Sequence, residues 1–179
     1  MASTSTARIW TMRAAFPALA VLIMFFHLLP LDTEPRFWAP PDLLLLIALT
    51  WSMRRPEFVP PISIALVILL EDLLLLRPPG LMALLAVLGC GVLKARAAPH
   101  RESTFVSDWL AIAAVLTVIA ALNRLTLALF AVEQAPLGLT VIQVVMTILA
   151  YPLVVWLSQT ILGVRKLSPA EAETLVHRR

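Results

Sequence analysis

Six long apolar runs, separated by short polar segments, dominate the pattern of hydrophobic and polar positions along the chain. A helix needs about 20 consecutive apolar residues to cross a hydrocarbon core ~30 Å thick. The runs approach that length, and they are Met12 to Leu31, Phe37 to Met53, Val59 to Leu76, Leu81 to Ala98, Asp108 to Val132 and Pro136 to Val164. The second and fourth are short and span only if flanking side chains reach the interface. The pattern predicts an all-α, polytopic membrane bundle of six transmembrane helices.

Proline marks the expected start of the second, fourth and sixth helices, in the segments PPDLLLLIAL from Pro40, PPGLMALLAV from Pro78 and APLGLTVIQV around Pro136. A proline in the first helical turn loses no internal hydrogen bond and presets the backbone angle. The six helices are therefore expected to form three hairpins. We expect residues 1–166 to be a single six-helix transmembrane domain and residues 167–179 to be a short cytoplasmic tail.

Composition agrees with a membrane location. The 179 residues are 60% hydrophobic and 14% charged, with a mean hydropathy of +0.91, which is too apolar for a soluble domain. The first run resembles a signal peptide, because Arg8 and Arg13 precede an apolar stretch, but the following LDTEPRF offers no small-x-small cleavage site. We expect this run to remain as an anchor.

The distribution of Lys and Arg predicts the orientation, since basic residues are retained on the cytoplasmic side. Placing the N-terminus in the cytoplasm leaves eleven of the fourteen basic residues there. Arg36 and Arg77 then face outward, and Arg124 falls within the fifth helix. Both termini are therefore predicted to be cytoplasmic. The basic residues form short clusters between apolar runs, so no nucleic-acid partner is expected.

Four charged side chains fall inside the predicted spans: Asp42, Glu71, Asp72 and Arg124. Such charges cost roughly 2.5 to 3.5 kcal/mol on insertion scales and usually face protein or a water-filled cavity. At ~1.5 Å per residue, Asp72 and Arg124 share an outer layer, so we favour a structural ion pair between them over a transport site. Glu71 and Asp72 lie about 100° apart around their helix, so one should face the bundle and the other the headgroups or another protein. Asp42 is expected to cap its helix.

Small residues on the fifth helix recur at three- and four-residue spacing, which marks helix-helix contacts in membranes. This predicted packing face comprises Ala113, Thr117, Ala120, Ala121 and Ala128, with Arg124 on the same ridge. The sixth helix carries a polar stripe that also suits a protein-facing side, formed by Thr140, Gln143, Thr147, Ala150 and Ser158.

No catalytic, cofactor-binding or metal-binding residues are predicted. The three histidines are scattered, and neither Ser63 nor Ser158 has a base or orienting acid at a recognisable spacing. The single cysteine, Cys90, lies within an apolar run and is expected to be a small packing residue. An enzyme is therefore not expected.

Three segments at characteristic spacings carry a family resemblance: PDLLLL from Pro41, WxxRRP from Trp51 and EDLLLLxxPG from Glu71. Together they resemble MreD, the family of rod shape-determining membrane proteins. The likeness covers Pro40 to about Leu93, and the six-helix layout and basic tail agree over the whole chain. The family usually has a hydrophobic-Asp pair where this chain has two acids, and the register favours Asp72 for the family's role.

The resemblance implies a non-enzymatic scaffold of the cell-elongation complex in the bacterial inner membrane, with a role in cell shape and peptidoglycan synthesis. The implied partners are MreC, the actin-like MreB, RodZ, the glycan polymerase RodA, a class B penicillin-binding transpeptidase and the lipid bilayer. No cofactor is implied.

The MreD fold is also similar to the substrate-binding subunits of energy-coupling-factor transporters, which supplies the rival hypothesis of a small-solute-binding subunit. Its pocket would be the four-residue charged layer. Short outer loops and the lack of an aromatic cage weigh against this alternative. A membrane enzyme of lipid or cell-wall chemistry lacks the His/Asp clusters that would indicate it.

Overall fold

A computed structural model describes residues 6–29, 39–96, 104–161 and 163. Within these ranges the chain forms six α-helices and one short 3-10 helix, without any strand. They are α1 (Thr6–Leu28), α2 (Leu43–Arg54), η1 (Pro56–Phe58), α3 (Pro61–Leu74), α4 (Leu81–Arg96), α5 (Phe105–Leu129) and α6 (Leu137–Thr160). Each α-helix overlaps one of the predicted apolar runs, so the all-helical fold is confirmed for the described part. The predicted tail at 167–179 lies outside the described residues.

Three helices are long and apolar enough to cross a membrane: α1, from Ala7 to Leu28, together with α5 and α6. The helices α2, α3 and α4 contain 12, 14 and 16 residues. At ~1.5 Å per residue they extend roughly 18 to 24 Å, which is less than the ~30 Å hydrocarbon core. The apolar runs in the sequence are longer than these helices because they include the flanking turns. The fold is thus a helical bundle with three candidate membrane spans.

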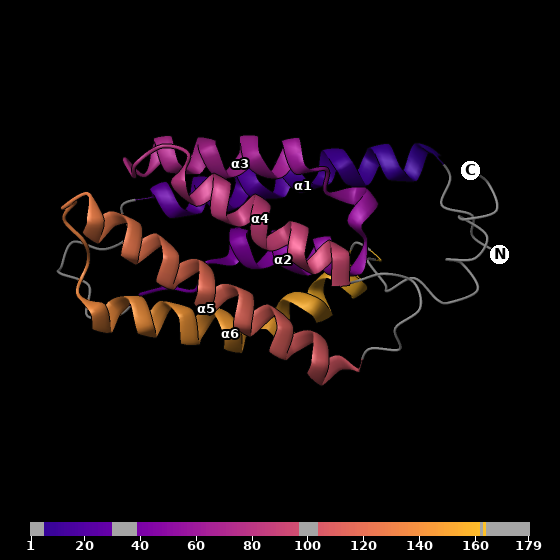
Figure 1. The fold of residues 1–179 in the computed structure, drawn as a ribbon. Coiled ribbons are helices and arrows are strands. Elements are labelled where there is room, and N and C mark those ends of the chain that lie inside the picture. Colours follow the sequence, from indigo (N-terminus) through magenta and orange to yellow (C-terminus); the bar gives the residue numbers. More distant parts are fainter. Residues whose placement is uncertain (1–5, 30–38, 97–103, 162, 164–179) are drawn as a thin grey trace.

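The shortest helix, α2, lies at the centre of the bundle. Figure 1 shows it between the α1/α3 pair and the α5/α6 pair, and it contacts all five of the other α-helices. Every residue from Leu44 to Arg54 is buried. A helix that is apolar on all sides is stable when protein surrounds it. The neighbouring helices therefore shield α2 from its surroundings.

Most of the prolines near helix starts lie just before the helix and not in its first turn. Asp42 is the N-cap of α2, so Pro40 stands outside the helix. Gly80 directly precedes α4 with a φ of 91°, a left-handed conformation that favours glycine. Pro136 is the N-cap of α6, and Pro61 occupies the first turn of α3. The predicted place of proline in the first helical turn is therefore corrected for α2, α4 and α6. A side-chain cap and a glycine turn set the starts of α2 and α4, and Pro136 is the N-cap of α6.

The helix α4 lies between α3 and α5 and contacts both. Its Gly89 permits a close approach to α5, because an added Cβ would stand 2.8 Å from Cδ1 of Ile119 and 2.9 Å from Cγ1 of Val115. The neighbouring Cys90 is fully buried, in agreement with its predicted packing role. This arrangement separates α3 from α5, which determines the surroundings of the charged residues.

Candidate functional site

The last turn of α3 carries two adjacent carboxylates, and both are buried. Glu71 is 3% exposed and Asp72 is 0% exposed. Both carboxylates are therefore covered within the chain by itself, and the expectation that one of them faces headgroups or another protein stays a prediction. Because α3 packs against α4 and also contacts α1, two side chains about 100° apart can each meet a different helix.

Asp72 faces the start of α4. Its Oδ2 accepts a hydrogen bond from the backbone N–H of Gly80 at 3.1 Å, and its backbone carbonyl accepts one from Arg77 at 2.9 Å. A carboxylate beside the N-terminus of a helix satisfies a free backbone donor and favours the positive end of the helix dipole. Asp72 therefore closes the turn between α3 and α4.

Asp42 caps α2, as predicted. Its Oδ1 accepts a hydrogen bond from the backbone N–H of Leu45 at 3.0 Å. Its own backbone N–H donates to Oγ1 of Thr147 at 2.9 Å, and the Thr147 hydroxyl donates to the carbonyl of Gln143 at 2.7 Å. The predicted protein-facing stripe of α6 is confirmed at its buried members, Thr147 and Ser158.

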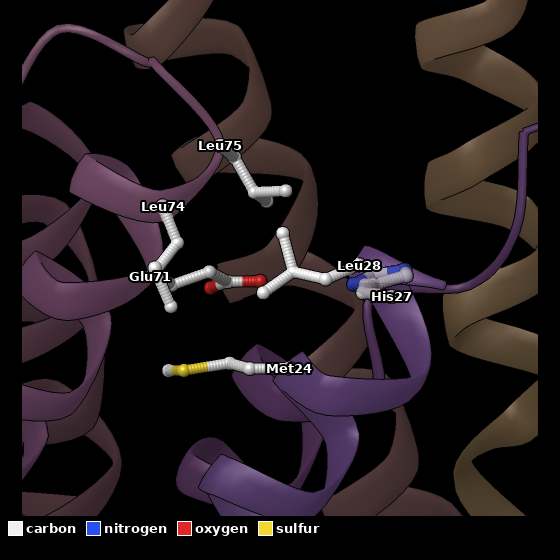
Figure 2. A pocket seen from close by; sticks show the side chains of 6 residues that line it. All are labelled: Met24, His27, Leu28, Glu71, Leu74 and Leu75. Atoms are coloured by element: carbon white, nitrogen blue, oxygen red, sulfur yellow. The ribbon is translucent and has the colours of Figure 1, made fainter. Parts of the chain in front are cut away.

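Glu71 faces the opposite way, toward α1. Its carboxylate lies in a narrow cleft whose other lining residues are Met24, His27, Leu28, Leu74 and Leu75, and Figure 2 shows it pointing from α3 toward the end of α1. No hydrogen bond or ion pair joins this carboxylate to another residue of the described ranges. The Nδ1 atom of His27, on the α1 wall, is also buried without a hydrogen-bond partner. The lining of the cleft is therefore apolar apart from two groups without hydrogen bonds, the Glu71 carboxylate and Nδ1 of His27.

Electrostatic interactions connect the three acids. The charge of Asp42 acts on both Glu71 and Asp72, and the nearby guanidinium of Arg77 opposes it at both positions. The structure therefore brings together three members of the predicted polar layer, and the positive charge beside them is Arg77. The sequence signal for Arg77 was its position five residues after Asp72, in the following turn.

Arg124 belongs to a different contact. Its Nη1 donates to the carbonyl oxygen of Ala135 at 2.9 Å and to Oγ1 of Thr140 at 2.7 Å. It thereby holds the turn between α5 and α6, where Gln134 in return donates to the Arg124 carbonyl at 3.2 Å. The predicted Asp72–Arg124 ion pair is not formed in the described structure, because α4 lies between the helices that carry the two residues.

The predicted small-residue face of α5 does not pack within the chain as expected. Thr117, Ala121 and Ala128 are exposed, while Ala113 and Ala120 are half-buried. The buried side of α5 is instead formed by Asp108, Ala111, Ile112, Leu116 and Ile119. The small residue at the close α4–α5 contact is on α4, at Gly89.

A second group of buried polar residues lies near the Arg54 end of α2 and escaped the sequence analysis. Arg54 is 7% exposed and Asp108 is 2% exposed, and both interact electrostatically with the fully buried Tyr151. Trp51 donates its indole Nε1–H to Oγ of Ser158 at 3.0 Å, which fastens α2 to α6. Ser158 belongs to the polar stripe predicted for the sixth helix, and the signals for the other residues were the RR pair after Trp51 and a lone tyrosine in an apolar helix.

The arrangement of these groups suits the holding of helices and the acceptance of a positive charge at Glu71. Within the described residues no three His, Cys, Asp or Glu side chains gather closely enough to hold a metal ion. Comparisons of the chain with protein-family models, with curated proteins and with solved structures find no match in any of the three.

Proposed function

We propose that this protein is an MreD-type membrane scaffold that binds the membrane segment of MreC and thereby supports the cell-elongation complex of a rod-shaped bacterium. The proposal includes its location in the bacterial inner membrane and its association, through MreC, with MreB, RodZ, RodA and a class B penicillin-binding transpeptidase. It assigns no reaction to the chain.

The observation that carries this proposal is that the EDLLLLRPPG segment fixes the end of α3 to the start of α4. The spacing between its Asp and its Gly matches a hydrogen bond from the Gly80 N–H to Asp72 that joins α3 to α4. The whole resembling region, from Pro40 to about Leu93, forms the central helix α2 and its neighbours α3 and α4. Residues that fix one helix against another are what a rigid holding protein requires.

A topology with six crossings and both termini in the cytoplasm is part of the proposal. Its support is the grouping of basic residues at one end of the bundle, where Arg8 donates to the carbonyl of Gly163 at 3.2 Å and Arg13 donates to that of Glu57 at 3.0 Å. The first contact joins the start of α1 to the residues just after α6, so both lie at the same end. In this topology the short helix α2 crosses within the shelter of the other helices.

Co-purification and depletion test the proposal. We expect MreC to be recovered with this protein in mild detergent, and depletion in its rod-shaped host to round the cells. The alternative hypothesis is a small-solute-binding subunit of an energy-coupling-factor-type transporter. It predicts that depletion leaves cell shape normal and abolishes vitamin uptake. Normal shape with intact MreC complexes and lost uptake would replace the scaffold proposal with the transport proposal.

Reporter fusions test the topology separately. Paired alkaline phosphatase and fluorescent-protein fusions after Arg36, Arg55, Arg77, Arg101, Glu133 and Arg179 should alternate between outside and inside, starting outside. Two consecutive fusions on the same side would remove the intervening crossing.

A further inference from the structure

We propose that the cleft around Glu71 receives a basic side chain from the transmembrane helix of a partner. This inference rests on the proposed scaffold function and adds to it the place and the chemistry of the contact. The cleft is formed by the last turns of α1 and α3, which end side by side at one end of the bundle.

Glu71 is the one member of the acidic group with neither carboxylate oxygen hydrogen-bonded to a described residue; Asp72 uses Oδ2 and leaves Oδ1 buried without a partner. Asp42 accepts from the N–H of Leu45, and Asp72 accepts from the N–H of Gly80. The side chain of Glu71 is only 3% exposed, and it has no hydrogen-bond partner among the described residues. A buried polar group without a partner is unfavourable, so a group that supplies the missing donor binds there with a large gain.

Charge complementarity indicates that the missing donor is a cation. Asp42, Glu71 and Asp72 contribute three formal negative charges and Arg77 contributes one positive charge, so the formal net charge of the group is −2. The guanidinium of Arg77 forms no ion pair with these acids. An added ammonium or guanidinium group therefore finds favourable potential at Glu71.

The shape of the site favours the end of a single side chain on a helix. The walls around Glu71 are apolar apart from His27 and stand close together, so the methylene stem of a lysine or arginine enters as the ends of α1 and α3 move apart. Leu74 of this cleft continues an exposed apolar row along α3, formed by Ile62, Leu66 and Leu70 at four-residue spacing. An apolar transmembrane helix lying along this row would bring a basic side chain near its end to Glu71.

The test compares MreC recovery by wild-type protein and by three variants, Glu71→Gln, Glu71→Leu and Glu71→Lys, in mild detergent. We expect recovery to fall at least tenfold with Glu71→Leu and further with Glu71→Lys, with Glu71→Gln in between because it keeps an acceptor. Glu57→Gln is the matched control, since it removes one carboxylate from the other end of the bundle, where Glu57 pairs with Arg55 at 3.3 Å. Its recovery of MreC should equal that of wild type.

A folding readout separates a binding role from a structural role. The isolated Glu71→Leu variant should unfold at the same temperature as wild type or at a higher one, because the carboxylate it loses has no partner in the isolated chain. Lower stability together with unchanged MreC recovery would overturn the inference. If wild-type protein itself fails to recover MreC, both the inference and the proposed function fall, whereas equal recovery by all variants overturns the inference alone.

Charge reversal identifies the partner residue. Each basic residue in the membrane segment of MreC is changed to Glu in combination with Glu71→Lys, and one combination should restore recovery to within twofold of wild type. A lipid is the competing occupant, tested by native mass spectrometry from nanodiscs that contain phosphatidylethanolamine. Retention of that lipid by wild type and its loss in Glu71→Leu, with MreC recovery unchanged, would assign the cleft to a lipid and overturn the proposal.

Discussion

Two adjacent carboxylates of α3, Asp72 and Glu71, lie on different sides of the helix and have different surroundings. On the α4 side, Asp72 accepts a hydrogen bond from the N–H of Gly80, at the start of the next helix. On the α1 side, Glu71 meets the apolar last turn of α1 and an unpartnered Nδ1 of His27. The two acids have nearly the same depth and burial, so the difference comes from what each neighbouring helix presents. A helix start offers free donors, and a helix end does not.

The difference extends beyond the two acids. The α4 side is closely packed, with Gly89 against α5 and the Nζ of Lys94 donating to the carbonyl of Val59. The α1 side contains the cleft around Glu71. We infer that contacts on the α4 side stabilise the isolated chain, while the α1 side is adapted for binding.

The largest expected effect is at Asp72. Replacing it by leucine leaves the partly buried N–H of Gly80 without its acceptor, and we expect the free energy of unfolding to fall by about 2 kcal/mol. Asp72→Asn keeps an acceptor and should lose about 1 kcal/mol. Denaturant unfolding in detergent, followed by circular dichroism, measures both, with Glu71→Leu as the comparison. Equal losses at the two positions would abolish the distinction between the two sides of α3.

The close approach of α4 to α5 gives the next largest effect. Gly89→Leu forces a side chain against Val115 and Ile119, and we expect a loss of about 2 kcal/mol from overpacking. Ala121→Leu is the control on the exposed side of α5 and should change stability by less than about 0.5 kcal/mol in the isolated chain. A large loss at Ala121 would show that the small-residue ridge packs within the bundle after all.

A smaller effect is expected at the far end of α4. Lys94→Met removes the hydrogen bond to the Val59 carbonyl, and we expect a loss of about 1 kcal/mol. Arg96→Met is the matched control, because Arg96 is exposed two residues further along the same helix. The same unfolding measurement applies. Identical results for the two variants would remove Lys94 from the contacts that hold α4.

The smallest expected value is the coupling between Asp72 and Arg124. Since α4 separates them, a double-mutant cycle with Asp72→Leu and Arg124→Leu should give an interaction free energy within about 0.5 kcal/mol of zero. A cycle with Arg124→Leu and Thr140→Val should give a larger value, because these side chains are hydrogen-bonded at 2.7 Å. Coupling above 1 kcal/mol between Asp72 and Arg124 would restore the predicted ion pair.

The positions of the helices could be predicted from the sequence because apolar length is a local property. Their ends were less well predicted, since hydropathy includes apolar turns: the second run began at Phe37, whereas α2 begins at Leu43. The Asp42 cap was predictable for the same reason, because its partner lies three residues away.

The partners of the charged residues required the tertiary arrangement. Depth along a helix placed Asp72 and Arg124 in one layer, but depth does not reveal which helix lies between them. The Pro-x-Gly turn eight residues after Asp72 was visible as a spacing, and the structure supplies its physical meaning in the bond to Gly80. The α5 ridge does not form the close contact within the chain, because small residues permit close approach without requiring it; that contact lies at Gly89, and packing of the ridge against a partner helix stays a prediction.

The burial of α2 has a consequence for the order in which the chain is assembled. Two of its polar donors, the backbone N–H of Asp42 and the indole of Trp51, bond to hydroxyls on α6 that lie 105 and 107 residues further along. The ribosome must add 82 residues, 55 to 136, between the end of α2 and the start of α6. At roughly 5 to 20 residues per second this takes about 4 to 16 s. During synthesis these two donors therefore lack their acceptors until α6 has been made. Any truncation before α6 leaves both donors without Thr147 and Ser158.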